Sequence, residues 1–344
     1  MPPRSDRSQR RASIAAGAAA LVFTAAATAG DAAEISTVTF DRYYGDATVA
    51  ELTRRLVSPL GAALEHGEDP LRDRHQLVDL AGERFLLRVP ARRPGGGYGL
   101  IVFVPPWADA RLPAGWGAVL DGAGLIFASA AHSGNGAPVM ARREPLALLA
   151  ARNVLDRFPV DPARVYVAGF SGGSRIALRL ALGYPDLFTG VLLNAGSDEI
   201  GSVDLPMPPR DLWLRFARNT RVVFLTGERD TEHANEDQLS LRALHRWCVR
   251  RIESYTEPRV DHRVASPTSL ARGVASLDRA SVSSPDHFAA CEAAVDAEVE
   301  ARARDVERAL AAGQREKARS ALALLDSAFG GVAGDRIAGL RSRL

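Results

Sequence analysis

The sequence predicts an α/β fold in which a mostly parallel sheet is covered by helices on both faces. Three short apolar runs, 99–104 (GLIVFV), 125–130 (LIFASA) and 164–168 (RVYVA), alternate with segments of helical periodicity. These runs lack polar alternation, which is typical of parallel strands buried on both faces. The composition, with 47% hydrophobic and 24% charged residues, is that of a globular protein.

The other elements follow the same two periodicities. Residues 48–64 predict an amphipathic helix in spite of Pro59, and residues 76–89 predict two short strands around Ala81-Gly82-Glu83. Residues 144–158 have helical spacing and predict a helix, and the proline near its start is tolerated in the first helical turn. Further helices are expected at 174–184 and 236–250, and further strands at 190–193, 221–225 and 251–256.

The first 29 residues predict a secretory signal peptide. Arginines at positions 4 to 11 precede an apolar run at 14–27, and Ala27-Thr28-Ala29 offers small residues for cleavage, as does a cut after Ala33. The run is too short for a stable membrane anchor, which needs ~20 strongly apolar residues, and an uncleaved anchor is the alternative. We therefore expect an exported protein, secreted or periplasmic, with no membrane contact after cleavage.

The charge balance argues against one class of partner. The chain carries 43 Lys and Arg residues against 41 Asp and Glu, and loss of residues 1–29 would change its net charge from +2 to −1. A near-neutral chain lacks the general positive field that holds nucleic acid, so no nucleic-acid partner is expected. No group of Cys, His and acidic residues has the spacing of a zinc site. We therefore expect no metal and no cofactor.

The composition changes at about residue 284, where alanine, glutamate and arginine become frequent. Ser284-Pro285-Asp286 has the pattern of a helix start, and helices are expected from there to Gly313 and over 315–329. We interpret these helices as an appendage that packs on the main domain. The expected organisation is a signal peptide (1–29), a main domain (30–283) and a helical extension (284–344).

The residues that carry chemistry lie around Ser171. The pattern Gly169-x-Ser171-x-Gly173 directly follows a buried strand and directly precedes a helix, which is the context of a nucleophile elbow. The glycines are needed because the serine takes a strained backbone conformation and the turn leaves no room for neighbouring side chains. The start of the helix would stabilise developing negative charge. The alternative is a tight glycine turn without catalytic consequence.

At this point the sequence resembles the α/β-hydrolase fold. More narrowly, residues 160–196, with their Asp-Pro-x-Arg-Val-Tyr lead-in, are similar to the nucleophile region of the secreted esterases that include polyhydroxybutyrate depolymerases and feruloyl esterases. The resemblance spans about residues 86–278. It implies that the 30–283 domain hydrolyses carboxylic esters, small or polymeric, through a serine nucleophile and without a cofactor.

The fold supplies its catalytic acid and histidine after the serine, in that order along the chain. Asp230 is the predicted acid, because it follows the end of the strand at 221–225. An acid at this position orients the histidine in the fold that the sequence resembles. Asp198, Glu199 and Asp237 are the competing candidates, and the alternative role of Asp230 is a solvated loop carboxylate.

Four histidines follow Ser171 in the sequence. His262 is the predicted catalytic histidine, because it comes after the last expected strand and before a proline and a helix. His287, in the first turn of the appendage, is the alternative. His245 is expected to be a packing or surface residue inside a helix. His233 lies only three residues after Asp230, which leaves little room for a serine, a histidine and an acid in line.

The oxyanion hole is expected to use the backbone amides of Gly172 and Trp107. Relatives carry His-Gly after the strand that corresponds to 99–104, whereas this chain has Pro105-Pro106-Trp107. Pro106 has no amide hydrogen, and Trp107 aligns with the residue that donates in relatives. The departure leaves the rate and the acyl preference open.

These residues together predict a secreted serine esterase with a Ser171, His262 and Asp230 triad. A non-catalytic binding protein on the same scaffold and an exported serine peptidase are the alternatives. The two cysteines, Cys248 and Cys291, are expected to form a disulfide in an exported chain, the alternative being two buried thiols. Such a bridge would tie the appendage to the main domain, and because it brackets His262 we expect it to restrain that loop.

Overall fold

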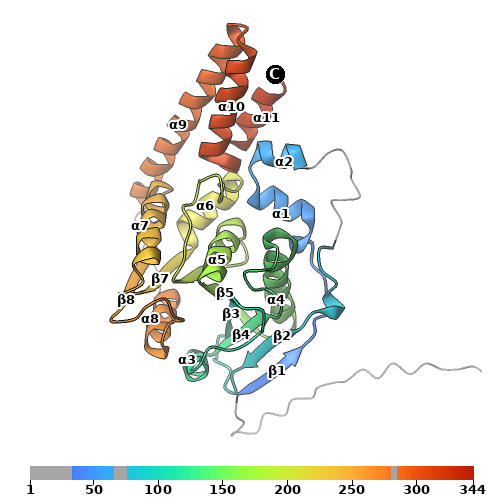
Figure 1. The fold of residues 1–344 in the computed structure, drawn as a ribbon, viewed down its shortest axis with the longest axis vertical. Helices are drawn as coiled ribbons and strands as arrows, with labels where there is room; N and C mark the ends of the chain where they lie inside the picture. Colours follow the sequence, from blue (N-terminus) through green and yellow to red (C-terminus); the bar gives the residue numbers. More distant parts are fainter. Residues whose placement is uncertain (1–32, 66–75, 280–284) are drawn as a thin grey trace, which may run out of the picture. The chain divides into compact units, whose positions relative to one another are not determined.

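One mixed sheet organises the chain, in the strand order β1-β2-β4-β3-β5-β6-β7-β8 (Figure 1). The computed structural model describes residues 33–65, 76–279 and 285–344, and the predicted signal peptide lies outside them. Strand β2 pairs antiparallel with both β1 and β4 at one edge, and the six strands β4-β3-β5-β6-β7-β8 are parallel to one another. The strands are β1 (Glu34–Val38), β2 (Phe85–Val89), β3 (Tyr98–Val104), β4 (Leu125–Ala130), β5 (Val160–Phe170), β6 (Gly190–Asn194), β7 (Arg221–Gly227) and β8 (Ile252–Glu257).

Helices cover both faces of this sheet, so the predicted α/β architecture is confirmed. Helices α3 (Trp116–Ala123) and α8 (Pro267–Asp278) pack on one face, where Trp116 and Leu270 are fully buried. A larger hydrophobic cluster lies on the other face. The helices that contribute to it include α1 (Val49–Leu56), α4 (Glu144–Arg157), α5 (Gly172–Gly183), α6 (Arg210–Asn219) and α7 (Thr231–Arg246).

The helix predicted over 48–64 is two helices in the structure. Helix α1 ends at Leu56, Val57 is extended (φ −117°, ψ 145°), and α2 (Pro59–Glu65) starts at the proline. The ring of a proline disfavours helical backbone in the residue before it and removes one amide donor. The amphipathic pattern continues across this break, so periodicity alone missed it.

The pair of strands predicted over 76–89 is a single strand, β2. Gln76 forms only an isolated bridge with Thr48, and Leu80–Gly82 is a 3₁₀ turn in which the Asp79 carboxylate accepts from the Ala81 amide at 3.3 Å. Val78 and Leu80 are buried in the main hydrophobic cluster without belonging to the sheet. Their apolar character therefore reflects packing from a loop.

The C-terminal helices α9 (Pro285–Ala311), α10 (Arg315–Phe329) and α11 (Gly334–Arg341) contact one another, and α10 and α11 also contact α2 (Figure 1). Their apolar side chains belong to the same cluster as those of α4 to α7. The Phe329 ring meets the Trp247 ring edge-on at 6.0 Å, and the Gly331 amide donates to the Met207 carbonyl at 2.8 Å. The boundary predicted at residue 284 falls in a segment that is not described, and it stays a prediction.

The predicted disulfide is confirmed, since Cys248 and Cys291 are joined with their Cα atoms 5.8 Å apart. Cys248 follows the end of α7 and is fully buried, while Cys291 lies in the second turn of α9. The bond therefore links the appended helices to the body of the protein. In the part of the chain that the structure describes, no helix combines the length and apolar character that a membrane span requires.

Candidate active site

The turn between β5 and α5 holds Ser171 in a strained conformation. Ser171 has φ 53° and ψ −127°, a region that residues with a Cβ rarely adopt and that costs on the order of 1–3 kcal/mol. Its amide donates to the Asn194 carbonyl at the end of β6 (2.9 Å), and its own carbonyl accepts from the Ser174 amide (2.9 Å). The turn thus ties the end of one strand to the next and places the serine at the carboxyl edge of the sheet.

Two glycines permit this turn by allowing close backbone approaches. A Cβ on Gly169 would overlap the Gly173 carbonyl oxygen, because the strand and the helix cross there. A Cβ on Gly173 would overlap the Val104 carbonyl oxygen, because the start of α5 rests directly on the end of β3. The pattern that predicted the elbow is therefore required by packing on both sides of Ser171.

Asp230 lies just beyond β7, as the residue that precedes α7. Its amide donates to the Gly227 carbonyl at 3.1 Å, and its carbonyl accepts from the Ala234 amide in the first turn of α7. The side chain is almost fully buried. Burial by itself raises the pKa of the Asp230 carboxyl, but hydrogen bonds from His233 and His262 outweigh it, and the net pKa is lowered.

His262 lies in the loop between β8 and α8. This loop is held to the ends of neighbouring strands, since the Arg229 amide donates to the Val260 carbonyl (2.9 Å) and the Ala265 amide donates to Asn194 Oδ1 (2.7 Å). The imidazole stacks on the Phe170 ring with centroids 4.8 Å apart. These contacts bring a residue that is 91 positions from Ser171 to the same edge of the sheet.

The three predicted residues form a continuous hydrogen-bonded chain. His262 Nδ1 lies 2.7 Å from Asp230 Oδ2, and His262 Nε2 lies 3.0 Å from Ser171 Oγ. A carboxylate can only accept, so Nδ1 carries the proton and Nε2 is free to accept from the serine hydroxyl. This tautomer is the one that lets a histidine act as a base toward a serine.

A second histidine, His233, shares Asp230. Its Nδ1 lies 2.7 Å from Asp230 Oδ1, and its ring stacks on His262 with centroids 4.1 Å apart and planes 16° apart. The short spacing was expected to leave little room for a serine, His233 and the acid in line, and it is His262 that contacts Ser171. The contact of His233 with the acid was not anticipated: α7 starts at Thr231, and its first turn places His233 beside the carboxylate. The three-residue spacing is itself the signal, since positions i and i+3 share a helix face.

Two of the three competing acids, Asp198 and Asp237, have other partners. Asp237 is buried and accepts hydrogen bonds from the hydroxyls of Ser197 (2.6 Å) and Thr226, and burial raises the pKa of its carboxyl. Asp198 forms an ion pair with Arg175. Neither has a histidine partner among the described residues.

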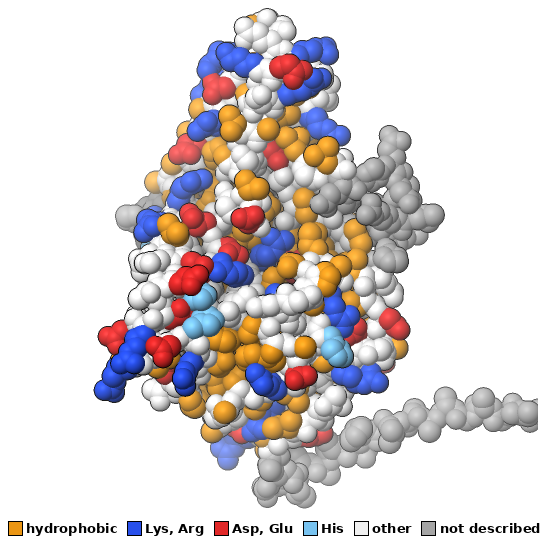
Figure 2. Space-filling view, viewed as in Figure 1, with side chains coloured by type: hydrophobic (Ala, Val, Ile, Leu, Met, Phe, Trp, Pro, Cys, Tyr) orange, Lys and Arg blue, Asp and Glu red, His pale blue; other side chains and the backbone are white. Residues whose placement is uncertain are grey.

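The other two histidines that follow Ser171 are His245 and His287. His245 is exposed near the end of α7. The side chain of His287, the alternative catalytic histidine, lies outside the described residues. Surface histidines are visible on one face of the molecule beside acidic and basic side chains, with a group of exposed hydrophobic side chains below them (Figure 2).

Asp230, His233 and His262 also present donor atoms within 4.8 Å of one another, close enough for a metal ion. Both Nδ1 atoms already lie at hydrogen-bond distance from the carboxylate, one at each oxygen. These donor atoms are therefore already hydrogen-bonded to one another, and the geometry fits a carboxylate that two histidines share. That the protein needs no metal stays a prediction.

The loop that carries Trp107 lies against the elbow. Gly173 lies against the backbone of Val104 and Pro105, and the Asn135 side chain lies against Gly172. The backbone amide of Asn135 donates to the Pro106 carbonyl at 2.9 Å. Within the described chain, neither the Gly172 amide nor the Trp107 amide donates to an internal acceptor. Both remain available for an oxyanion, and their role stays a prediction.

Arg143 anchors this loop from behind and was not found from the sequence. It is buried in the π-helical turn Val139–Arg143, where its Nε donates to the Ser133 carbonyl (2.8 Å) and its Nη2 to the Pro105 carbonyl (3.1 Å). One guanidinium therefore joins the two loops that flank the elbow. Pro105 and Pro106 lack amide donors, so at these two positions the backbone can offer only carbonyl acceptors.

The α/β-hydrolase fold is defined by a serine on a strained strand-to-helix turn at the edge of a mostly parallel sheet, with an acid and a histidine later in the sequence. The chain has the α/β-hydrolase fold. No family model matches the sequence. A stretch of 66 residues is 44% identical to NocK of Nocardia uniformis subsp. tsuyamanensis, a protein named as an esterase; the stretch is 18% of this chain and 17% of that protein.

Solved structures resemble the chain at low sequence identity. S-formylglutathione hydrolase of Staphylococcus aureus matches 72% of this chain and 99% of its own, at 9% identity and a TM-score of 0.47. A ferulic acid esterase matches 70% and 95%, at 11% identity and a TM-score of 0.46. An esterase of Pyrobaculum calidifontis matches 57% and 78%, at 15% identity and a TM-score of 0.43. Because identities and scores are low, the fold assignment rests on this chain's own sheet and turn.

Proposed function

We propose that the protein is a carboxylic-ester hydrolase that forms an acyl-enzyme on Ser171. The observation that carries this proposal is the chain of hydrogen bonds from Ser171 Oγ to His262 (3.0 Å) and from His262 to Asp230 (2.7 Å). A serine hydroxyl is a weak nucleophile unless a base takes its proton, and the imidazole is placed to do so. The strained turn keeps the hydroxyl at the sheet edge.

The reaction would run in two acyl-transfer steps. Ser171 Oγ attacks the ester carbonyl while His262 Nε2 takes its proton and then returns it to the leaving alcohol. Asp230 stays ionised, because its lowered pKa keeps it a carboxylate that stabilises the imidazolium. The amides of Gly172 and Trp107 would hold the oxyanion, and water would then release the acid.

The setting and the substrate are proposed in the same terms. A disulfide is typical of exported proteins, which supports secretion or periplasmic export by the signal peptide proposed at residues 1–29. The proposed substrate is a small-molecule or polymeric ester. Polyesters and feruloyl esters are specific cases, which the narrower resemblance to polyhydroxybutyrate depolymerases and feruloyl esterases suggests.

A fluorophosphonate probe and a panel of esters test the proposal. Wild-type protein should be labelled and should hydrolyse p-nitrophenyl acyl esters, whereas Ser171→Ala should not be labelled and should lose activity by on the order of 10⁶. Ser174→Ala is the matched control, because the Ser174 hydroxyl is buried on α5 with no described hydrogen-bond partner. Feruloyl esters and polyhydroxybutyrate in the same panel test the narrower substrates.

Other outcomes identify the alternatives. A wild-type protein that the probe does not label would contradict the proposal and favour a non-catalytic binding protein. Cleavage of peptide amides faster than the matched esters would favour a peptidase. Labelling that persists in Ser171→Ala would place the nucleophile elsewhere.

A further inference from the structure

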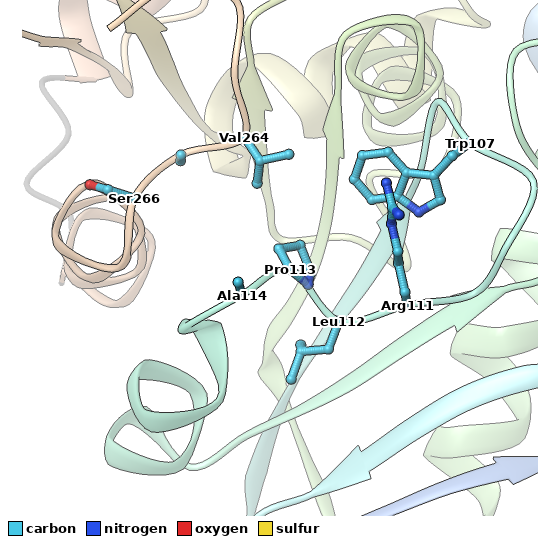
Figure 3. A pocket seen from close by; sticks show the side chains of 8 residues that line it. Trp107, Arg111, Leu112, Pro113, Ala114, Val264 and Ser266 are labelled. Carbon is cyan, nitrogen blue, oxygen red and sulfur yellow. The ribbon is translucent and has the colours of Figure 1, made fainter. Parts of the chain in front are cut away.

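A pocket of about 450 Å³ opens beside the candidate active site (Figure 3). One wall is the segment between α3 and the loop of Pro105, Pro106 and Trp107, here called the oxyanion loop. The opposite wall is the segment that connects His262 to α8. Its lining residues are Trp107, Arg111, Leu112, Pro113, Ala114, Val264, Ala265 and Ser266. Because both walls continue directly from predicted catalytic elements, a group that fills this pocket would belong to the reacting ester.

Arg111 is the charged residue of this lining. Its guanidinium carbon lies 4.2 Å from the centroid of the Trp107 indole, and in Figure 3 its side chain extends along that ring. Many arginines among the described residues pair with carboxylates, as the largely buried side chains of Arg55 and Arg88 do with Asp186 and Asp121, whereas Arg111 is exposed. Arg111 has no carboxylate partner among the described residues.

The indole beneath it has a second unpaired donor. Trp107 Nε1 is buried and has no hydrogen-bond partner in the described chain. A buried donor without an acceptor is costly, and native proteins usually satisfy it. The Arg111 guanidinium therefore stacks on an indole whose N–H also lacks an acceptor in the described chain, at the edge of a pocket that apolar side chains and Ser266 line.

The stack also places the charge close to the reacting centre. The Trp107 ring lies 6.2 Å from the Phe170 ring, and Phe170 directly precedes Ser171. The Arg111 guanidinium carbon lies 4.2 Å from the Trp107 ring centroid, so its distance from the Phe170 ring centroid cannot exceed these two distances added together. A short carbon chain spans such a separation.

We propose that Arg111 and Trp107 bind a carboxylate carried by the ester substrate, so that the preferred substrates are hemiesters of dicarboxylic acids or esters with an acidic alcohol. This rests on the proposed esterase function. The planar guanidinium fork matches a carboxylate through two parallel hydrogen bonds, and stacking on the indole orders the side chain before binding. The apolar side chains of Leu112, Pro113 and Val264 would contact the methylene chain.

Kinetics on charged and neutral esters test the site. We expect kcat/KM for monoethyl glutarate, followed by acid release in a pH-stat, to exceed that for neutral ethyl pentanoate by tenfold or more. Arg111→Gln should remove this preference and leave ethyl pentanoate within twofold. Arg272→Gln is the matched control, since Arg272 also lies over an aromatic ring (Tyr255, 5.3 Å) but outside the pocket. The butyrate ester of glycolic acid, compared with ethyl butyrate, reports whether the charge belongs on the alcohol.

A binding experiment separates this inference from the proposed function. Monoethyl glutarate and diethyl glutarate are titrated into Ser171→Ala protein, with and without Arg111→Gln, by calorimetry. Binding of the hemiester that Arg111→Gln weakens at least tenfold supports the anion site, even if the wild type hydrolyses neither ester and the esterase proposal fails. Equal affinity for hemiester and diester, or an affinity that Arg111→Gln does not change, overturns the site even if ester hydrolysis is confirmed.

Discussion

Removal of the Cys248–Cys291 disulfide should lower stability by a calculable amount. The bond closes a loop over a sequence separation of 43 residues. The chain-entropy relation gives about 4 kcal/mol for a loop of this length at 25 °C. Over a compact unit that extends from Ala32 to Leu344, an unfolding entropy of ~2.1 cal/mol/K per residue turns that free energy into a fall in Tm of about 6 °C.

The appended helices should nevertheless stay attached. Arg210 on α6 forms ion pairs with Glu292 (2.8 Å) and Asp296 on α9, and the Asp326 carboxylate on α10 accepts from the Leu60 amide at 3.0 Å. Among the described residues, the hydrogen bonds that hold the His262 loop run to Arg229 and to Asn194, and none of them runs to α9. The structure therefore changes the expectation that the disulfide restrains the histidine loop: catalysis by the folded protein should not depend on it.

The assay compares wild-type protein with Cys248→Ala/Cys291→Ala. Alanine is chosen because a serine at the fully buried position 248 would add an unsatisfied hydroxyl. Thermal unfolding should show the fall in Tm, while kcat/KM at 25 °C should stay within twofold of wild type. A Tm within 1 °C of wild type would refute the entropy reasoning, and activity lost well below the melting transition would show that the bridge does restrain the His262 loop.

Three further predictions concern the site. His233→Phe keeps the ring stack but removes one hydrogen bond to Asp230, which is worth about 1.5 kcal/mol, so kcat should fall about tenfold with little change in KM. An unchanged kcat would show that the hydrogen bond from His262 is sufficient to orient the acid. Arg143→Met leaves the Ser133 and Pro105 carbonyls without a hydrogen bond, and each unsatisfied carbonyl should destabilise the folded protein by about 1–3 kcal/mol, so Tm and kcat should both fall. A variant with wild-type kcat would show that Arg143 does not position the loop. The folded-state pKa of Asp230 is lowered, so the stability that its ionised form contributes is present above the unfolded pKa of about 3.9 and is lost as pH falls through the folded pKa. The difference in unfolding free energy between wild type and Asp230→Asn should therefore narrow below about pH 4. A difference that stays constant from pH 7 to 3 would contradict the assignment.

The sequence by itself determined the elements whose signal is local. The strands at 99–104 and 125–130 are visible because a buried parallel strand is continuously apolar. The elbow is visible because close backbone approaches require glycine two residues before and two residues after the serine. Several elements were not predicted from periodicity, among them β1, α3, α6 (Arg210–Asn219) and α11 (Gly334–Arg341). Strand β1 is an edge strand whose residues are largely exposed, and α3 contains two glycines that weaken its helical pattern.

The candidate site divides in the same way. Ser171, Asp230 and His262 could be proposed from chain order and strand ends, and the structure places them within hydrogen-bond reach. The pairing of His233 with the same carboxylate and the anchoring of the oxyanion loop by Arg143 depend on where α7 begins and how the π-helical turn packs. Such contacts are set by the three-dimensional meeting of segments far apart in sequence, and local propensity carries no information about which segments meet. For that reason only the tertiary structure decided which polar groups surround Asp230 and which guanidinium remains unpaired in the adjoining pocket.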